Sequence, residues 1–526
     1  MLEILPRPPL HEIKQSQLAM WVDESIWGHR LYDEQTPWLC ILEMLCIAQS
    51  EVVKGQAFVE YEPNKLKYTT YHRLYLRNIL FNNPHIEAIS SEYLDDAERW
   101  NMWIKAIVSN IGGLDSPDFS YLKKRFEFFK DFADVVKFLQ SNAIEGDSNK
   151  RWSSKFTFPY GPDCIYEDLR ISGTQKTNDR RFFGRTGELL YLMLCRSDRG
   201  AEILLHLQQM RIIASDYPNG YKGSKWNQLV LALQPEQDRT DTRSSGSPPY
   251  LPYAKLPEYD RLANDWLNIL RCNLPEYDAL PHIVTITGLH LVVYLLSRAK
   301  ATLGETEPPR FILEIVAPRK TTIRDLASDE YQKNNNLPQR AIEHYIRITA
   351  DLPAWQACIE SHTPIEDAID LLQTQFAWFV KEEEDLGGAG SPDSLLDKLR
   401  EKAVGRHKHH LAKFHGSWSR EIGLSSSRSS RRTRYAPTDS LLRTLVLTCV
   451  PTRMEFQEFL AKLHHEYGFV IGDKQAEDII NSGNADREDF VANAMRLERR
   501  LASIGLLKRL SDACAYVQNP FSSEVS

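Results

Sequence analysis

Basic side chains in the last quarter of the chain have the types and spacing that suit one chemistry, the binding of a polyanion. Residues 397–435 contain eleven Lys or Arg and three acids, a local charge of +8 in a chain of net charge −7. Cations held along one surface gain affinity for nucleic acid by releasing counterions from its phosphates. The candidate nucleic-acid-binding residues of this segment are Arg406, Lys408, Lys413, Arg431, Arg432 and Arg434.

A second group of cations lies on a predicted amphipathic helix near the C-terminus. Its apolar residues follow one another at intervals of 4, 3, 4 and 3 positions, which makes a continuous helical stripe over Phe490, Ala494, Leu497, Leu501 and Ile504. Five further candidate phosphate contacts lie off the stripe or begin the hairpin that follows: Arg496, Arg499, Arg500, Lys508 and Arg509. In a competing interpretation the arginines form a solvated face or pair with Glu488, Asp489 and Glu498.

The elements expected to position these cations form a C-terminal module over 436–526. Thr438 or Asp439 is expected to cap a first helix, and a capping box at 452–455 to start a second, which ends at Gly468. A short helix over 474–480, the long helix and a hairpin of 506–510 with 514–517 complete it. Helices followed by a terminal hairpin are the plan of a winged helix. Such a module binds DNA, docks proteins or is purely structural, and these three roles stay open here.

Two other groups of residues suit an anion or a metal ion. Arg180, Arg181 and Arg185 precede a predicted helix at Glu188, and a helix N-terminus attracts anions. The same arginines can instead pair with Asp163, Glu167, Asp168 or Asp179. Glu314 lies on the clearest predicted strand, 311–316, where nucleases place an acid for Mg²⁺. Its nearest lysine in that direction, Lys320, is six residues away, so a structural strand is favoured.

The signatures of the common nucleotide, hydrolase and zinc sites are missing. The sequence contains no Walker A, GxGxxG, GxSxG or HExxH pattern, and residues 219–225 are interpreted as a surface turn. The histidines of the basic segment, His407, His409, His410 and His415, are interpreted as a solvated helix without metal. We therefore expect no metal and no cofactor.

The fold class expected is mainly α with minor β, in a multidomain helical protein with a C-terminal winged-helix-like module. Helices are expected over 71–81, 93–111 and 119–139, among others. The predicted division is an N-terminal helical domain (1–150), a helical middle domain with short strands (151–252), a mixed α/β region (253–390), a basic Ser-rich hinge (391–435) and the winged-helix-like domain (436–526).

Cysteine usage and hydropathy indicate a cytoplasmic protein that does not enter a membrane. None of the eight cysteines forms a CxxC pair, and most lie in apolar runs, so buried free thiols are expected. The first ten residues do not have the pattern of a signal peptide. The longest apolar run, 283–296, is expected to be too short to span a bilayer.

Three stretches carry a family resemblance. They are 27–38 (WGHRLYDEQTPW), 182–191 (FFGRTGELLY) and 505–517, from GLLKR to YV. Together they resemble bacterial proteins encoded in multigene anti-phage islands, among them the methylation-associated and phosphorothioation-linked defence systems. The resemblance spans most of the chain and implies an accessory subunit beside modification or ATPase proteins. It brings no catalytic residues with it.

The leading hypothesis is therefore a non-enzymatic accessory component of a bacterial defence system. It would contact DNA, partner subunits from the same operon, or both, through its C-terminal module. One alternative is a divergent metal-dependent nuclease that uses Glu314. Another is a scaffold whose Trp- and Tyr-rich N-terminal helices bind only protein.

Overall fold

The computed structural model describes most of the chain between residues 3 and 522. The described ranges are 3–8, 21–29, 31–81, 83–92, 94–111, 113–114, 116–141, 159–167, 169–172, 175–178, 184–219, 221, 223–240, 242–275, 277–317, 321–378, 390–427, 432–510 and 514–522. The protein is mainly helical, with 60% helix and 6% strand, as the sequence predicts.

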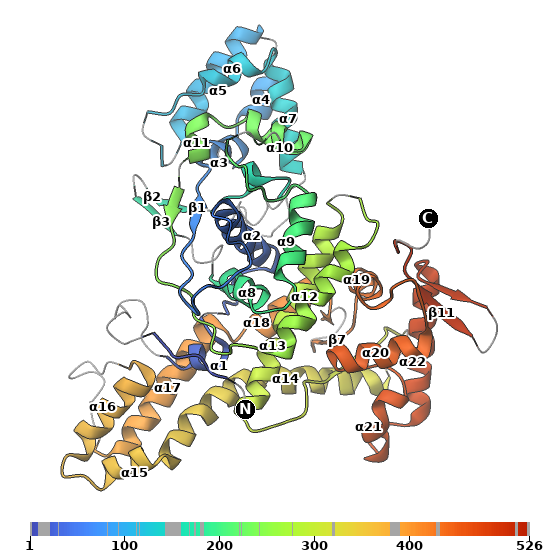
Figure 1. Cartoon of the computed structure of the whole chain (residues 1–526). Coiled ribbons are helices and arrows are strands. Elements are labelled where there is room, and N and C mark those ends of the chain that lie inside the picture. Colours follow the sequence, from blue (N-terminus) through green and yellow to red (C-terminus); the bar gives the residue numbers. More distant parts are fainter. Residues whose placement is uncertain are drawn as a thin grey trace. The chain divides into compact units, whose positions relative to one another are not determined.

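The chain folds into two compact units, one of which is an insertion in the other (Figure 1). Unit 2 is Trp38–Pro249, and unit 1 combines Met1–Pro37 with Tyr250–Ser526. The border at residue 250 lies close to the predicted boundary at 252. The other predicted boundaries do not separate compact units, because the segments 253–390, 391–435 and 436–526 belong to unit 1 together with the first 37 residues.

Unit 2 is built from short helices and two small antiparallel sheets. Its helices are α2 (Pro37–Val53), α3 (Leu74–Phe81), α4 (Ile86–Ser91), α5 (Asp96–Asn110), α6 (Ser120–Arg125), α7 (Phe129–Ser141), η3 (Pro162–Cys164), α8 (Thr186–Cys195), α9 (Gly200–Gln209), α10 (Lys225–Ala232) and α11 (Glu236–Thr240). Strand β1 (Thr69–Tyr71) pairs with β4 (Thr242–Ser244), and β2 (Leu169–Ser172) pairs with β3 (Gln175–Asn178). The helices predicted near 71–81 and 93–111 are confirmed, whereas the one predicted over 119–139 is two helices, α6 and α7.

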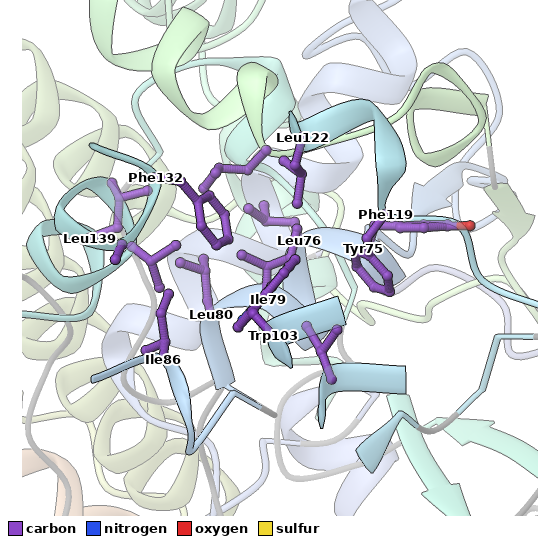
Figure 2. Close-up of a cluster of buried hydrophobic side chains, with 14 of the residues drawn as sticks. Tyr75, Leu76, Ile79, Leu80, Ile86, Trp103, Phe119, Leu122, Phe132 and Leu139 are labelled. Carbon is purple, nitrogen blue, oxygen red and sulfur yellow. The ribbon is translucent and has the colours of Figure 1, made fainter. Parts of the chain in front are cut away.

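An aromatic core holds helices α3 to α7 together (Figure 2). Trp103 and Phe132 meet nearly edge to face with ring centroids 4.7 Å apart, and Trp100 meets Phe129 at 5.1 Å. Edge-to-face contact brings the positive rim of one ring to the negative face of another, which adds to the effect of burying the rings. Asp95 starts α5 through a capping box with Glu98.

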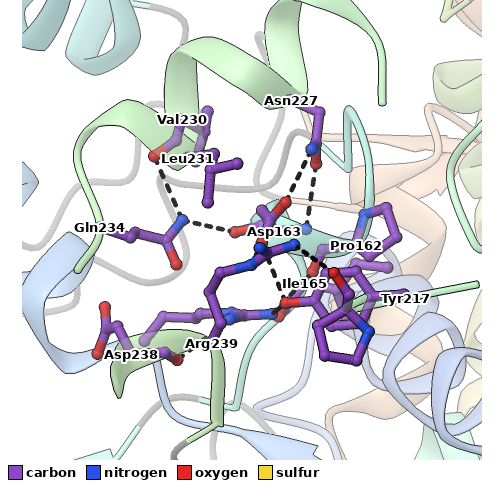
Figure 3. A network of polar contacts seen from close by, with 12 residues as sticks. Pro162, Asp163, Ile165, Tyr217, Asn227, Val230, Leu231, Gln234, Asp238 and Arg239 are labelled. Carbon is purple, nitrogen blue, oxygen red and sulfur yellow. Dashed lines mark hydrogen bonds and ion pairs between the residues drawn. The ribbon is translucent and has the colours of Figure 1, made fainter. Parts of the chain in front are cut away.

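A buried ionic network fixes η3 against α10 and α11 (Figure 3). The Asp163 side chain is fully buried and accepts hydrogen bonds from Asn227 Nδ2 (2.8 Å), Arg239 Nε (3.0 Å) and the Tyr217 hydroxyl (3.0 Å). Arg73, also fully buried, donates to Tyr217 Oη at 2.6 Å. A buried charge is tolerated when it is paired and hydrogen-bonded, so we assign this network a structural role.

Unit 1 contains the longer helices. They are α1 (Asp23–Trp27), α12 (Pro257–Leu270), α13 (Ala279–Thr302), α14 (Thr322–Arg347), η4 (Ile348–Asp351), α15 (Pro353–Ile359), α16 (Pro364–Phe376), α17 (Pro392–His410), α18 (Phe414–Glu421), α19 (Asp439–Cys449), α20 (Phe456–Tyr467), η5 (Lys474–Ala476), α21 (Glu477–Asn481) and α22 (Arg487–Ser503). The strands are β5 (Phe311–Ile312), β6 (Ser425–Ser426), β7 (Arg434–Tyr435), β8 (Arg453–Glu455), β9 (Phe469–Val470), β10 (Leu507–Arg509) and β11 (Ala515–Gln518).

Helix α13 is the central core helix of unit 1. It is 24 residues long, so the expectation that its apolar run is too short to cross a membrane was wrong in length. By length and composition it passes as a membrane span, but 83% of its most apolar window is buried inside the protein. It packs against α12, α14 and α18. Its apolar character is therefore explained by burial within the fold.

The segment predicted as a basic hinge is folded and packed. Leu395, Leu399, Ala403 and His407 recur every four residues along α17 and are buried, so they form the apolar stripe of a helix. This helix packs against α14 and α16. The hinge prediction was wrong because it was based on the charge and serine content of the segment, whereas the apolar residues at every fourth position make it a packed helix. Farther along, β6 pairs with β7, and residues 428–431 of the serine-rich stretch lie outside the described residues.

The C-terminal part of unit 1 follows the predicted order of elements, with strands β8 and β9 added. Helices α19, α20 and α22 and the β10–β11 hairpin form where expected, and Gly468 and Gly505 end two of the helices at φ +72° and +77°. The predicted capping box at 452–455 was wrong. Residues 453–455 are strand β8, which pairs with β11 and gives the sheet order β10-β11-β8.

Candidate functional site

Helix α22 presents the most distinctive surface of the C-terminal part. Its inner face buries Phe490, Leu497 and Leu501, three residues of the predicted stripe. On the other face Val491 is 39% exposed and Met495 45% exposed. These two side chains are four residues apart and therefore lie one turn apart on the same face. A helix that exposes two adjacent apolar side chains has a face suited to binding.

Most arginines of α22 are held by contacts within the protein. Arg500 Nε lies 2.6 Å from Asp439 Oδ1, and Arg487 Nη1 lies 3.2 Å from Asp473 Oδ2. Arg496 Nε donates to Ile315 O at 3.2 Å. Arg499 is exposed, and no partner for it is found among the described residues. Of the three candidates on this helix, Arg499 alone makes no hydrogen bond or ion pair with another described residue.

The β10–β11 hairpin supplies two more exposed cations. Lys508 and Arg509 are both exposed and are neighbours on β10, so their side chains point to opposite faces of the sheet. Arg509 Nε lies 3.4 Å from Glu498 Oε1 of α22. Because both side chains of this pair have partial access to water, the pair contributes little to stability. The structure thus brings Arg509 to the surface of α22.

Of the five described candidates between 397 and 435, two are enclosed and three are exposed. Arg406 and Arg434 are enclosed by ion pairs with Glu24 and Glu314. Both were predicted to bind nucleic acid, and the structure corrects this for each because the guanidinium neutralises a carboxylate that is 0% exposed. The remaining described candidates, Lys408, Lys413 and Arg432, are exposed. Arg431 lies outside the described residues.

Glu314 lies in an environment opposite to that of a metal ligand. Its carboxylate is fully buried; Oε1 accepts from Arg324 Nε at 2.8 Å and Oε2 accepts from Arg434 Nε. A divalent cation at this place would meet two guanidinium groups. In the described part of the chain, no three His, Cys, Asp or Glu side chains gather closely enough to hold a metal ion. The geometry therefore argues against the nuclease hypothesis based on Glu314. The predicted strand over 311–316 is regular only at Phe311–Ile312, which pairs in parallel with β9.

The anion position predicted before Glu188 is occupied by a side chain of the protein itself. Glu43 of α2 accepts from the backbone N–H of Arg185 at 3.2 Å and of Gly187 at 2.8 Å, and it thereby caps α8. The Arg185 guanidinium contacts Glu188 (2.5 Å) and the Ser247 carbonyl (2.6 Å). The prediction that Arg185 binds an external anion was therefore wrong. Arg180 and Arg181 lie outside the described residues.

Of the four histidines interpreted as solvated, His407 and His415 are buried, whereas His409 and His410 are at least partly exposed. His407 is 2% exposed and His415 is 1% exposed, which corrects that interpretation for both. Burial lowers the pKa of His407 to about 4 and the pKa of His415 to about 3, so both rings stay neutral. His415 lies 2.7 Å from the Tyr435 hydroxyl and 3.2 Å from Asn335 Oδ1. It is a core residue that joins α18 to α14 and β7.

A buried polar chain in unit 1 was missed by the sequence analysis. Asp265 Oδ2 lies 2.6 Å from His290 Nε2 and accepts from the Tyr467 hydroxyl at 2.7 Å, and this hydroxyl lies 3.7 Å from Cys449 Sγ. A thiolate would be needed for nucleophilic chemistry. Burial raises the pKa of Cys449 to about 12, so the thiol stays protonated. These four residues connect α12, α13, α19 and α20 and are structural.

Two hollows formed by described residues of unit 1 do not resemble a substrate pocket. The larger, about 390 Å³, is an open groove lined by side chains of opposite charge, with Arg340, Arg347 and Arg400 beside Glu343 and Asp397. The smaller, about 20 Å³, lies beside Glu24 and Arg406 and has room for about one water molecule. The exposed face of α22, with Arg499 and the hairpin cations, is therefore the strongest candidate site.

Comparison of the chain with protein-family models, with curated proteins and with solved structures finds no match.

Proposed function

We propose that this chain is a non-enzymatic, cytoplasmic accessory subunit of a bacterial anti-phage defence assembly that docks a partner protein through α22. The resemblance of residues 27–38, 182–191 and 505–517 to proteins of defence islands supports the setting. The observation that carries the docking role is the exposure of Val491 and Met495 one turn apart, next to the free cation Arg499.

The order of elements supports a winged-helix-like module as the docking unit. In a winged helix a first helix, a strand and a second helix precede the third helix and the terminal hairpin. Helix α19, strand β8 and helix α20 precede α22, and the hairpin strands β10 and β11 follow it, while β9, η5 and α21 are inserted between α20 and α22. The sheet order β10-β11-β8 also fits this plan. Helix α22 then has the position of the recognition helix, which contacts DNA or protein in such modules.

Protein is favoured over DNA as the partner because of the contacts of the arginines. Arg496 and Arg500 contact groups within the protein, so α22 has little positive charge to offer a phosphate backbone. Apolar side chains at the centre and an arginine at the rim are typical of protein interfaces. The partner expected is a protein with an apolar patch beside an acidic residue that faces Arg499.

The test is co-purification of the full-length chain with the proteins encoded beside its gene. We expect the double variant Val491→Asp/Met495→Asp to lose at least about 2 kcal/mol of binding, since it places two charges in the interface core. The matched control is Ile359→Asp, a change at a side chain that is 40% exposed on α15. If the double variant binds as the parent does while Ile359→Asp also binds, the proposed face is wrong.

Binding to nucleic acid is the second candidate, favoured by the exposure of Arg499, Lys508 and Arg509. A salt titration of duplex binding should give a slope that falls by about 0.9 for each phosphate contact removed in Arg499→Gln or Lys508→Gln. The control is Arg487→Gln, an exposed change at the other end of α22. A deletion of residues 397–526 would not test nucleic-acid binding alone. It would also remove Arg406, the ion-pair partner of Glu24, and β9, the strand that pairs with β5, so the rest of unit 1 would be destabilised. Absence of duplex binding at low salt would exclude this second role.

A further inference from the structure

Three arginines gather around one carboxylate at the end of β5. Arg324 Nε lies 2.8 Å from Glu314 Oε1, and Arg434 Nε donates to Glu314 Oε2. Arg496 approaches from α22 and donates to the carbonyl of the next residue, Ile315, at 3.2 Å. The three guanidinium groups come from α14, β7 and α22, which are far apart in sequence. They carry three positive charges against the single negative charge of Glu314.

The hydrogen-bonding capacity of these arginines is not used up. Arg434 has a side chain that is only 5% exposed, yet its Nη1 is buried and has no hydrogen-bond partner among the described residues. Leaving a buried charged donor without an acceptor is costly. For the Arg324 side chain, 27% exposed, the described part of the chain offers one acceptor, at Nε. A guanidinium carries five N–H donors in a fixed plane, so each of the two has donors left for a ligand.

The excess charge agrees with this deficit of acceptors. Burial lowers the pKa of Arg496 from its ordinary value, against the attraction of Glu314 and of Asp489. Asp489 acts on Arg496 through its charge and is itself partly open to water. The three guanidinium groups therefore outnumber the carboxylates of Glu314 and Asp489, which leaves a local excess of positive charge. A dianion with several oxygens would neutralise the excess positive charge and would also supply hydrogen-bond acceptors for the unpaired N–H donors.

We propose that the side chains of Arg324, Arg434 and Arg496 bind a phosphate dianion, either free phosphate or the terminal phosphate of a small molecule. Arginine suits this role because its planar fork pairs with two phosphate oxygens at once. Arg324 and Arg496 are partly exposed, whereas Nη1 of Arg434 is buried and has no hydrogen-bond partner among the described residues. A phosphodiester carries one negative charge where the dianion carries two, so it should bind more weakly. Arg496 lies on α22, as the docking face does, but the phosphate proposal does not depend on the docking proposal.

The experiment is a titration of the full-length protein with sodium phosphate at constant ionic strength, followed by calorimetry and by the shift in unfolding temperature. Parallel titrations use a nucleoside 5′-monophosphate, the same nucleoside without phosphate, and dimethyl phosphate as the diester. We expect saturable binding with a Kd below about 1 mM for phosphate or the monophosphate. Tighter binding of inorganic phosphate would indicate free phosphate as the ligand, and tighter binding of the nucleoside monophosphate would indicate the terminal phosphate of a small molecule. Absence of saturable binding in both arms overturns the proposal.

Variants with opposite expected effects separate binding from folding. Arg324→Gln and Arg496→Gln should each weaken binding about tenfold, because each removes a charged hydrogen-bond donor. Glu314→Gln should strengthen it, because it removes the competing charge. The control is Arg443→Gln, at an exposed arginine of α19, which should leave Kd unchanged. If Arg324→Gln and Arg496→Gln both fold and bind phosphate as the parent does, the site is refuted.

Discussion

Replacing Arg406 with methionine is expected to destabilise the packing of α1 on α17 by about 3–5 kcal/mol. Both oxygens of Glu24 accept from the Arg406 guanidinium, one of them from Nη1 at 3.2 Å. The Glu24 side chain is 0% exposed and the Arg406 side chain 15% exposed. Methionine keeps an unbranched side chain but leaves a buried carboxylate without a partner. The cost is the loss of this neutralisation, which far exceeds that of an exposed ion pair.

The assay is native-state hydrogen exchange read by mass spectrometry on peptides that cover residues 21–29 and 392–410, since exchange reports local opening free energies. Lys408→Met is the control. Lys408 is exposed on the same helix, so this change should stay within about 0.5 kcal/mol of the parent. The double variant Glu24→Gln/Arg406→Met removes both charges and should lose no more than about 2 kcal/mol.

Two results would refute this reasoning. One is a loss below about 1 kcal/mol in Arg406→Met, which would give the ion pair the strength of a surface pair. The other is a double variant as unstable as Arg406→Met, which would assign the loss to packing and not to the unpaired charge.

Three further changes test other features. Burial holds the pKa of His415 at about 3, below its ordinary 6.5, so the unfolded chain takes up a proton that the folded protein refuses. The urea midpoint should therefore fall as pH is lowered from about 6.5 towards 4, and His415→Gln should flatten this dependence; an unchanged slope contradicts the assignment. Gly187→Ala should lower the unfolding temperature, at a cost of about 1–3 kcal/mol, because the added Cβ would lie 2.5 Å from Glu43 Cβ. Gly405→Ala should raise the unfolding temperature. The glycine lies inside α17, nothing lies within 4 Å of the added Cβ, and alanine removes the roughly 0.5–1 kcal/mol that glycine costs within a helix. A lower unfolding temperature would contradict this prediction.

Local sequence signals predicted the C-terminal helices well. The spacing of Phe490, Ala494, Leu497 and Leu501 reappears as the buried face of α22. Gly468 and Gly505 end their helices because the left-handed conformation there favours a residue without Cβ. These features depend on residues within one or two turns, so the sequence contains all the information they need.

Features that depend on distant partners could not be predicted in the same way. Residues 452–455 match a capping box, but pairing of β8 with β11, more than sixty residues later, makes them extended. The charge of the 397–435 segment suggested a polyanion site, whereas Arg434 and Arg406 meet carboxylates 120 and 382 residues away. A count of charges does not reveal such pairs. The unpartnered Arg434 Nη1 is likewise visible only in three dimensions.

Because unit 2 is inserted between the two parts of unit 1, the residues of α1 are synthesised long before the residues that contact them. The indole N–H of Trp27 donates to the carbonyl of Leu295, 268 residues later, and Glu24 pairs with Arg406, 382 residues later. At about 5–20 residues per second, the ribosome needs roughly 20–80 s to add those 382 residues. During that time unit 2 can fold. Trp27 and Glu24 of α1, which are buried in the folded protein, remain exposed to water until their partners have been synthesised. Helix α1 is thus synthesised long before the residues that hold it in place.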